Sequence, residues 1–401
     1  MKKRNNDIPK KPNAIVYFLG WCVLAPFFKI KYNIKYHRMK EKLQEPYILI
    51  ANHSNTVDPF LAAISVFPNR LNFVGGYAYA QKGILGFLFK LVHAIPKFQY
   101  QIDLASIKQM IGIVRNGGNL ALFPSGRLPT YGQNEVVTPA MAKMLKMAKV
   151  NIYDVRIEGA YLSRPKWSKK YRRGRIDVTV NKFLTKEELA LLSVDQVNEL
   201  VQKRLNYNEF RDYQDFKQIE YKGKDLAEGI EQVLYMCPSC YEEFKMTSKG
   251  NEVKCNHCGK TWHINSKGYF EEQDLVRDNH DWSLIIKEKV KEEVRKEDFE
   301  LKDFAEIRIL EKGKEVIYGH GEVKLNKDGI TYNGTFKNKE QEIFFAIDEL
   351  ISLPFRCSVN FEIAYNNDVL RFCPMKTEQI TKWCLCVEAL KEIKTKKVPN
   401  F

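Results

Sequence analysis

The sequence lacks features that identify several large classes of protein. No small-residue cleavage site follows the basic first residues and the apolar segment after them, so we expect no cleavable secretory signal. No Gly-x-Ser-x-Gly motif occurs, which argues against a hydrolase built on a nucleophile elbow. No convincing internal repeat is present. Because we expect no secretory signal, we also expect the nine cysteines, an odd number, to be reduced in a cytosolic compartment.

A hydrophobic run long enough for a full membrane span is also missing. Residues 14–28 are uncharged and largely apolar, but fifteen helical residues reach only about 22 Å, against a hydrocarbon core of roughly 30 Å. Pro26 should disturb the last turn. A basic collar follows at Lys29, Lys31, Lys35, His37, Arg38, Lys40 and Lys42. Residues 1–42 thus predict a helix embedded in one leaflet of an anionic membrane, with a buried core helix as the alternative.

The composition indicates packed domains with a positive surface. A chain of 401 residues is long enough for two or three domains, and 44% hydrophobic and 12% aromatic residues indicate folded cores. The net charge of +15 favours a polyanionic partner, unless it serves solubility alone. Candidate partners are anionic lipids, phosphate-bearing substrates, an acidic carrier protein and nucleic acid.

Residues 43–232 predict an α/β domain with a central mixed sheet. Strand-like and helix-like segments alternate there, which is the pattern of that fold class. The expected strands are 47–51, 120–123, 152–157 and 176–180, and the expected helices are 61–67, 84–93, 103–115 and 139–148, followed by a charged helical stretch over 186–233.

A short motif follows the first buried strand of this domain. Residues 52–58 read Asn-His-x₄-Asp, and Pro59 then opens the next helix with Asp58 as its expected N-cap. His53 therefore stands at the carboxyl end of a strand, where open α/β sheets place ligands. Asp58 is close enough in sequence to hold the imidazole. The pair suits a general base that removes a proton from a hydroxyl, although an N-cap aspartate beside a loop histidine is the simpler alternative.

Four cysteines between residues 233 and 270 predict a zinc ribbon. Cys237 and Cys240 form one Cys-x₂-Cys knuckle, and Cys255 and Cys258 form a second after fourteen intervening residues. Each knuckle directs two thiolates to one tetrahedral ion, so we expect structural zinc that drives the folding of the ribbon. The nearby His257 and His263 are then bystanders.

The last third of the chain predicts a second kind of fold. Residues 271–302 form a charged helical linker, and short strands with hairpin signals at Asp328-Gly329 and Asn333-Gly334 occupy the region from 303. A helix over 378–393 ends the chain. Residues 303–401 thus resemble the small β-barrels of the pleckstrin-homology and GRAM group, closed by a C-terminal helix.

Three further segments carry a resemblance to a known family. Residues 92–99 read Val-His-Ala-Ile-Pro-Lys-Phe-Gln, residues 123–127 read Phe-Pro-Ser-Gly-Arg, and residues 155–175 form a strand followed by a basic loop. With the Asn-His-x₄-Asp motif, they resemble the glycerolipid acyltransferase superfamily, of the lysophosphatidic acid acyltransferase type, over residues 10 to about 185. The apolar N-terminal helix and the appended ribbon resemble one bacterial branch of that family.

The resemblance implies acyl transfer from acyl-CoA or acyl carrier protein to the hydroxyl of a lysophospholipid, with 1-acylglycerol-3-phosphate as the first expectation. His53 would be the general base and Asp58 its orienting partner. The implied substrate-binding residues are Asn52, Lys97, Ser125, Gly126 and Arg127. A thioester is already activated, so a base, positioning and oxyanion stabilisation suffice without a covalent nucleophile. The implied location is the cytoplasmic face of a bacterial membrane.

The sequence departs from the family pattern at the expected phosphate-binding positions. Gln99 stands where an arginine is usual, with Lys97 two residues earlier. Ser125 replaces a glutamate, Leu128 replaces an arginine, and Arg127 lies one residue out of register. A lysine supplies charge but not the bidentate fork of an arginine. The acceptor therefore stays open to another lysolipid or lipid alcohol.

Two other classes of function compete with the enzyme. A degenerate acyltransferase fold could act as a lipid-binding or scaffold protein, which the lost glutamate favours and the intact Asn-His-x₄-Asp motif opposes.

The basic stretch 164–175 could bind phosphates, an acidic carrier or the membrane, or be a solvated loop. Nucleic-acid binding is disfavoured because the ribbon has few Lys or Arg residues and no interleaved aromatic and basic side chains.

Overall fold

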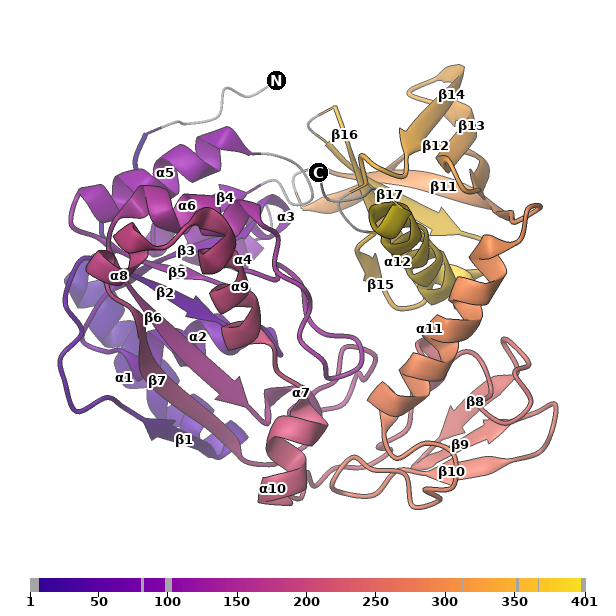
Figure 1. Ribbon diagram of the computed structural model, residues 1–401, viewed down its shortest axis with the longest axis horizontal. Helices are drawn as coiled ribbons and strands as arrows, with labels where there is room; N and C mark the ends of the chain where they lie inside the picture. The colour runs from indigo at the N-terminus through magenta and orange to yellow at the C-terminus, as the bar shows by residue number, and fades with distance from the viewer. Residues whose placement is uncertain are drawn as a thin grey trace. The chain divides into compact units, whose positions relative to one another are not determined.

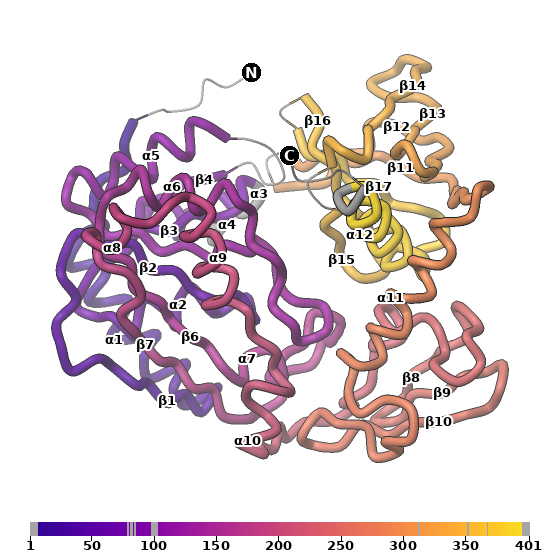
Figure 2. Tube along the Cα trace, viewed as in Figure 1, coloured from indigo at the N-terminus to yellow at the C-terminus, as the bar shows by residue number. Residues whose placement is uncertain are grey.

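The chain forms two compact units. The computed structural model describes residues 7–80, 83–97, 103–311, 313–350, 353–366 and 368–397. Unit 1 comprises Met1–Lys166 and Lys170–Gly223, and unit 2 comprises Trp167–Lys169 and Lys224–Phe401. Figure 1 shows the helices and strands of both, and Figure 2 follows the same chain as a trace. Unit 1 thus holds the predicted anchor and most of the predicted α/β domain, and unit 2 holds the regions predicted as ribbon, linker and β domain.

Unit 1 is built on a mixed sheet of the order β1-β7-β6-β2-β5-β3-β4. The β6–β7 pair is antiparallel, and the other neighbouring pairs are parallel. The described strands are β1 (Ile34–His37), β2 (Tyr47–Ala51), β3 (Leu71–Gly76), β4 (Ile95–Lys97), β5 (Asn119–Leu122), β6 (Asn151–Glu158) and β7 (Ile176–Leu184). This confirms the expected α/β domain with a central mixed sheet. Strands β1, β3 and β4 were not predicted, because they are short and lie in basic or glycine-rich sequence.

Helices cover both faces of this sheet, as Figure 1 shows. On β2, Ile48 and Ile50 pack with α5, α6 and α9 on one face, while Leu49 packs with α1 and α2 on the other. Burial on both faces explains why this strand reads as a continuous apolar run. The helices of unit 1 are α1 (Ala14–Tyr32), α2 (Asp58–Ser65), α3 (Tyr77–Ala80), α4 (Gly83–Leu91), α5 (Leu104–Arg115), α6 (Ala140–Ala148), α7 (Ala160–Ser163), α8 (Lys186–Leu191), α9 (Val194–Leu205), the π-helical η1 (Glu209–Gln214) and α10 (Asp215–Lys217).

Helix α1 is longer than predicted. It continues through Pro26 to Tyr32, where lysines in the last turn suit the helix dipole and Asn33 closes the helix in a left-handed conformation. Its nineteen residues measure about 28 Å, so by length and composition it is long and apolar enough to cross a membrane. The prediction that this segment is too short for a span was therefore wrong. Part of α1 packs on unit 1, because Trp21 stacks on Phe67 with ring centroids 4.3 Å apart and Tyr32 is buried, but only 6% of its apolar window is buried.

Two other local predictions need correction. The helical stretch expected over 186–233 ends at Lys217, and beyond it only the single 3₁₀ turn η2 (Ile230–Gln232) is regular among the described residues up to 233. Asp58 is the first residue of α2, whereas Val57 is its N-cap and makes no side-chain capping bond. The expectation that Asp58 is the N-cap of this helix was therefore wrong.

Unit 2 contains two antiparallel sheets, one in the region predicted as a ribbon and one in the region predicted as a β domain. Its small antiparallel sheet has the order β10-β9-β8, and its larger sheet has the order β14-β13-β12-β11-β17-β16-β15. Every neighbouring pair in the larger sheet is antiparallel. The elements are β8 (Met246–Lys249), β9 (Glu252–Cys255), β10 (Thr261–His263), α11 (Asn279–Arg295), β11 (Leu301–Glu311), β12 (Lys314–Leu325), β13 (Gly329–Phe336), β14 (Lys339–Ala346), β15 (Phe355–Arg356), β16 (Asn360–Tyr365), β17 (Asp368–Pro374), η3 (Thr377–Gln379) and α12 (Ile380–Lys397).

Buried polar contacts join the ribbon region to α11 and α12 within unit 2. The Lys382 ammonium on α12 lies 2.6 Å from a Glu243 oxygen and 2.9 Å from a Glu293 oxygen on α11. The Trp282 indole N–H donates to the carbonyl of Met236 at 2.8 Å. Because only 8% of the Lys382 side chain is exposed, losing one partner would leave a buried charge poorly compensated. The segment around Met236 and Glu243 therefore contacts both α11 and α12.

Candidate active site and metal centre

His53 and Asp58 form a hydrogen-bonded pair at the carboxyl end of β2. Nδ1 of His53 lies 2.9 Å from Oδ2 of Asp58. The Asp58 side chain is fully buried, whereas 20% of the His53 side chain is exposed. A carboxylate accepts, so Nδ1 carries the proton and Nε2 retains its lone pair. The imidazole is thus held through Nδ1, with its other nitrogen free of this partner.

The backbone of the turn holds the Asp58 carboxylate in place. Oδ2 accepts the N–H groups of Ser54 at 2.6 Å and Asn55 at 2.7 Å, in addition to the imidazole. Three donors therefore converge on one carboxylate oxygen. This arrangement explains why an aspartate five residues after the histidine suits the site, since the intervening turn supplies two of those donors.

Asn52 fastens this turn to the end of β6, and Asn55 fastens it to the start of α7. Asn52 donates to the carbonyl of Ile157 at 2.7 Å and accepts its N–H at 2.8 Å, as a neighbouring strand would. Asn55 donates to the carbonyl of Ala160 at 3.0 Å. The prediction placed Asn52 among the substrate-binding residues, but it is 1% exposed and its amide is bonded to the backbone. Its contacts in this structure hold the turn against Ile157.

The segment 123–127 follows β5, the neighbour of β2. The ring of Phe123 lies 4.7 Å from the ring of His53, which brings the start of this segment to the site. Gly126 has a φ of 67°, a left-handed turn that favours glycine, and its N–H donates to the carbonyl of Phe123. Ser125 is half-buried, and its hydroxyl donates to the carbonyl of Arg127 at 3.3 Å.

The two expected phosphate-binding cations have different surroundings. Arg127 forms an ion pair with Glu135 at 2.8 Å, so its guanidinium already has an anionic partner. Lys97 ends β4, three strands from β2 in the sheet order, which corresponds to about 14 Å. Desolvation lowers the pKa of Lys97, with the Asp103 carboxylate opposing that shift. Gln99 lies outside the described residues.

A fully buried acid near Asp58 was not predicted. Glu209 opens the π-helical segment η1, and the Tyr207 hydroxyl donates to it at 3.1 Å. Burial is the main reason that the pKa of Glu209 is raised to about 8, and the nearby carboxylates of Glu158 and Asp58 act in the same direction. A π-helix often marks a functional position. The sequence offers no local signal for it, because the contacts that bury Glu209 are distant in the chain.

The four predicted metal ligands come together in unit 2. The sulfurs of Cys237, Cys240, Cys255 and Cys258 all lie within 4.8 Å of one another. Two of the separations are 3.7 Å and 3.8 Å. Tetrahedral zinc with Zn–S bonds of about 2.3 Å keeps its sulfurs about 3.8 Å apart, so the donor set fits that ion. His263 instead binds Glu272 at 2.6 Å, and His257 is exposed.

Comparison with known proteins finds a family similarity over part of unit 1. Residues 33–158, which hold β1 to β6, match the sequence profile of the family described as Acyltransferase. The structure of the 1-acyl-sn-glycerophosphate (LPA) acyltransferase PlsC from Thermotoga maritima aligns at 15% identity and a TM-score of 0.40, covering 48% of this chain and 75% of that chain. No curated protein sequence matches. The segment that matches the Acyltransferase family therefore includes His53 and Asp58 and most of the sheet of unit 1.

Proposed function

We propose that the protein is an O-acyltransferase that moves a fatty acyl group from acyl-CoA or acyl carrier protein to a lysophospholipid hydroxyl, with 1-acylglycerol-3-phosphate as the first acceptor to test. One observation carries the proposal. Within the segment that matches the family, the His53 imidazole is held by a buried carboxylate with Nε2 left to accept a proton. That arrangement is what deprotonation of an alcohol requires.

The reaction follows from this geometry. Nε2 of His53 takes the proton of the acceptor hydroxyl as its oxygen attacks the thioester carbonyl carbon. The tetrahedral intermediate collapses, the C–S bond breaks, and the leaving thiolate takes the proton from the imidazolium. Asp58 holds the ring throughout and stabilises its transient positive charge. No covalent acyl-enzyme is needed, because the thioester is already activated.

The acceptor phosphate would be bound by Lys97 and Arg127, with Ser125 and Gly126 shaping the segment beside His53. The partial burial of Lys97 supports this role, since a desolvated cation gains more from a phosphate than an exposed one does. The ion pair with Glu135 would hold the Arg127 guanidinium in a fixed orientation. These assignments rest on position in the family motifs and on charge.

The exposed face of α1 supports attachment to one leaflet of a membrane. Ile15, Val23 and Ile30 are 70%, 68% and 72% exposed, although all three are strongly apolar. Trp21 and Tyr32 face the protein instead. A helix with one face packed on its own domain and an apolar face left open suits a monotopic anchor on an anionic, cytoplasmic membrane surface, as in the bacterial branch that the sequence resembles.

The same proposal covers unit 2. Four cysteines would hold structural zinc, which supplies a cross-link that a ribbon with little apolar core needs for folding. An all-antiparallel sheet of seven described strands followed by α12 supports the PH/GRAM-like assignment of residues 303–401. The finer division into ribbon 233–270, linker 271–302 and β domain 303–401 belongs to this proposal as well.

The direct test offers the purified protein acyl-CoA or acyl-loaded carrier protein with a panel of lysolipids and lipid alcohols, and identifies products by mass. His53→Ala should lose activity, whereas His37→Ala should keep it. His37 is a matched control because it also pairs with a buried aspartate, Asp177, at 2.9 Å. A folded wild-type protein that transfers no acyl group to any acceptor would favour the lipid-binding or scaffold alternative.

A further inference from the structure

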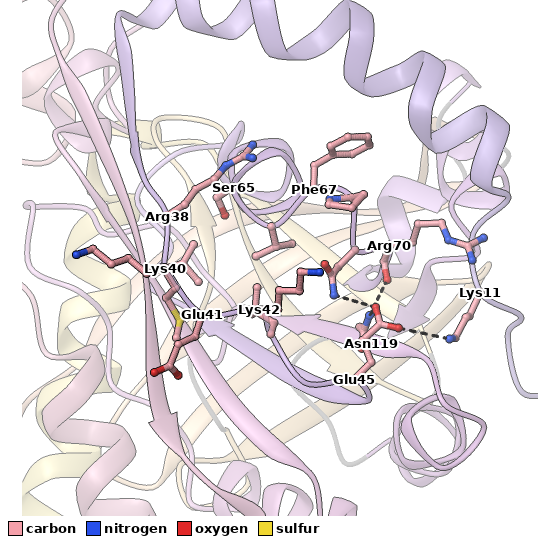
Figure 3. Close-up of a pocket in the computed structure, with 16 residues that line it drawn as sticks. Lys11, Arg38, Lys40, Glu41, Lys42, Glu45, Ser65, Phe67, Arg70 and Asn119 are labelled. Atoms are coloured by element: carbon pink, nitrogen blue, oxygen red, sulfur yellow. Dashed lines mark hydrogen bonds and ion pairs between the residues drawn. The ribbon is translucent and has the colours of Figure 1, made fainter.

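A cavity in unit 1 lies at the amino-terminal ends of the parallel strands β2 and β5, away from His53. A cavity of about 580 Å³ is lined there by residues around Glu45, which precedes β2, and by Asn119, which begins β5. His53 follows the other end of β2, about 17 Å along the strand. Figure 3 shows the cavity beneath α1. It is therefore separate from the proposed catalytic site.

The lining of this cavity is strongly cationic. Two acidic residues, Glu41 and Glu45, contribute to it, against five cations, which leaves a formal charge of +3. The five cations are Lys11, Arg38, Lys40, Lys42 and Arg70. Glu45 is already satisfied by the Asn69 and Asn119 amides at 2.9 Å and 2.6 Å and by Lys11 at 3.9 Å. The remaining positive charge is not neutralised by it.

The cations divide into fixed and free groups. Arg38 donates to the carbonyl of Ile64 at 3.1 Å, and Arg70 donates to the carbonyl of Pro12 at 2.7 Å, so both guanidiniums are held against the backbone. Neither Lys40 nor Lys42 forms an ion pair with any residue in the described part of the chain. The cavity thus offers two anchored guanidiniums beside two lysines without anionic partners.

An apolar surface adjoins this charged cavity. Phe67 lines the cavity, stacks on Trp21 of α1 at 4.3 Å and lies 6.3 Å from the ring of Phe18. Phe18 is 51% exposed and Ile15, one turn earlier, is 70% exposed. A cationic cavity therefore borders the open apolar face of α1, which is the pairing that an amphipathic anion requires.

We propose that this cavity binds the anionic headgroup of a glycerophospholipid, with the acyl chains lying along the exposed face of the first half of α1. The bound lipid acts here as an anchor and not as the acyl acceptor, because the cavity and His53 lie at opposite ends of strand β2. The proposal stands apart from the acyltransferase activity, since it uses none of the residues assigned to catalysis.

Calorimetric titration of the full-length protein with monomeric dihexanoyl phosphatidylglycerol tests the proposal. We expect one molecule to bind per chain at this site and Lys40→Gln/Lys42→Gln to weaken its binding about tenfold or more. Both lysines are exposed, so the variant should fold, which thermal unfolding checks. Lys29→Gln/Lys35→Gln is the matched control, because it removes the same charge from the basic collar outside the cavity.

Each outcome decides for or against the cavity. Retained binding in the control double variant and in His53→Ala, with loss in the cavity variant, supports the proposal even if no acyl transfer is found. Equal loss in both double variants shows diffuse attraction and overturns it, as does equal binding of dihexanoyl phosphatidylcholine. Inorganic phosphate binding as tightly as the lipid would overturn the lipid assignment and leave a free-anion site.

Discussion

Asp58→Asn separates the charge of the catalytic pair from its geometry. In the wild-type protein all three donors, the His53 imidazole and the N–H groups of Ser54 and Asn55, meet Oδ2 of the aspartate. The two backbone N–H groups exclude an NH₂ group from that position. The asparagine oxygen must therefore replace Oδ2, and it can still accept the Nδ1–H of His53. We expect the imidazole to keep its orientation and tautomer while its negative partner is lost.

The size of the effect follows from the lost charge. Opposite charges about 4 Å apart at an effective dielectric of 20 attract each other by about 4 kcal/mol. In the variant, the neutral hydrogen bond from His53 to the asparagine oxygen still contributes about 1 kcal/mol. The imidazolium formed in the transition state should thus lose roughly 3 kcal/mol, which lowers turnover about 100- to 200-fold. Oδ1 has no hydrogen-bond partner among the described residues, so the new NH₂ group should also cost about 1–3 kcal/mol of stability.

Single-turnover acyl transfer, corrected for the folded fraction, measures this. Asp58→Ala should be slower still, because it loses the orientation of the ring together with the charge. His53→Ala and the double variant with Asp58→Asn should be equally slow, since the aspartate acts only through the histidine. Near wild-type turnover in Asp58→Asn would refute the role of the charge. Equal rates for Asp58→Asn and Asp58→Ala would refute the retained orientation.

Three further predictions concern metal, pH and membrane. Cys240→Ser should lose stoichiometric zinc and lower the unfolding temperature of unit 2, whereas Cys22→Ser, which is outside the cluster, should do neither. Retention of one zinc per chain by Cys240→Ser would contradict the four-thiolate site. The pKa of Glu209 is raised to about 8, so the native state keeps a proton that the unfolded chain releases near pH 4.5. The free energy of unfolding should therefore fall as pH rises from about 4.5 to about 8, by at most about 5 kcal/mol. Glu209→Gln should remove that slope in urea unfolding, and an unchanged slope would refute the assignment. Val23→Ser/Ile30→Ser should weaken sedimentation with anionic vesicles at least tenfold, because both side chains are exposed on α1, and unchanged binding would place the anchor elsewhere.

The parts of the site that could be predicted are those encoded by neighbouring residues. The strand–turn–helix order placed His53 at the carboxyl end of β2, and the Cys-x₂-Cys spacing identified the four sulfurs that now lie together. Both depend on segments of fewer than 25 residues. The α/β class followed from alternating segments in the same way, while β1, β3 and β4 escaped because short strands carry little periodic signal.

The rest depends on contacts between distant segments. Asn52 was expected to bind substrate, and only its bonds to Ile157, 105 residues away, show that it fastens the turn. The burial of Glu209 and the contact of Lys382 with Glu243, 139 residues apart, likewise arise from tertiary packing. The length of α1 was underestimated because Pro26 was given more weight than the favourable last turn after it.

The direction of α1 constrains how unit 1 can meet a membrane. Strand β1 is parallel to β7, β7 is antiparallel to β6, and β6 is parallel to β2, so β1 runs opposite to β2 and begins on the side of the sheet where β2 ends. Helix α1 leads directly into β1. It therefore starts beside the cationic cavity and ends, about 28 Å later, on the side of the sheet where His53 lies. A membrane lying along the exposed face of α1 reaches both of these sides at once. Insertion of α1 upright would instead pull Trp21 and Tyr32 from the packing they share with unit 1. We therefore expect unit 1 to lie on its side, with an anchoring lipid at one end of α1 and the reacting lipid at the other.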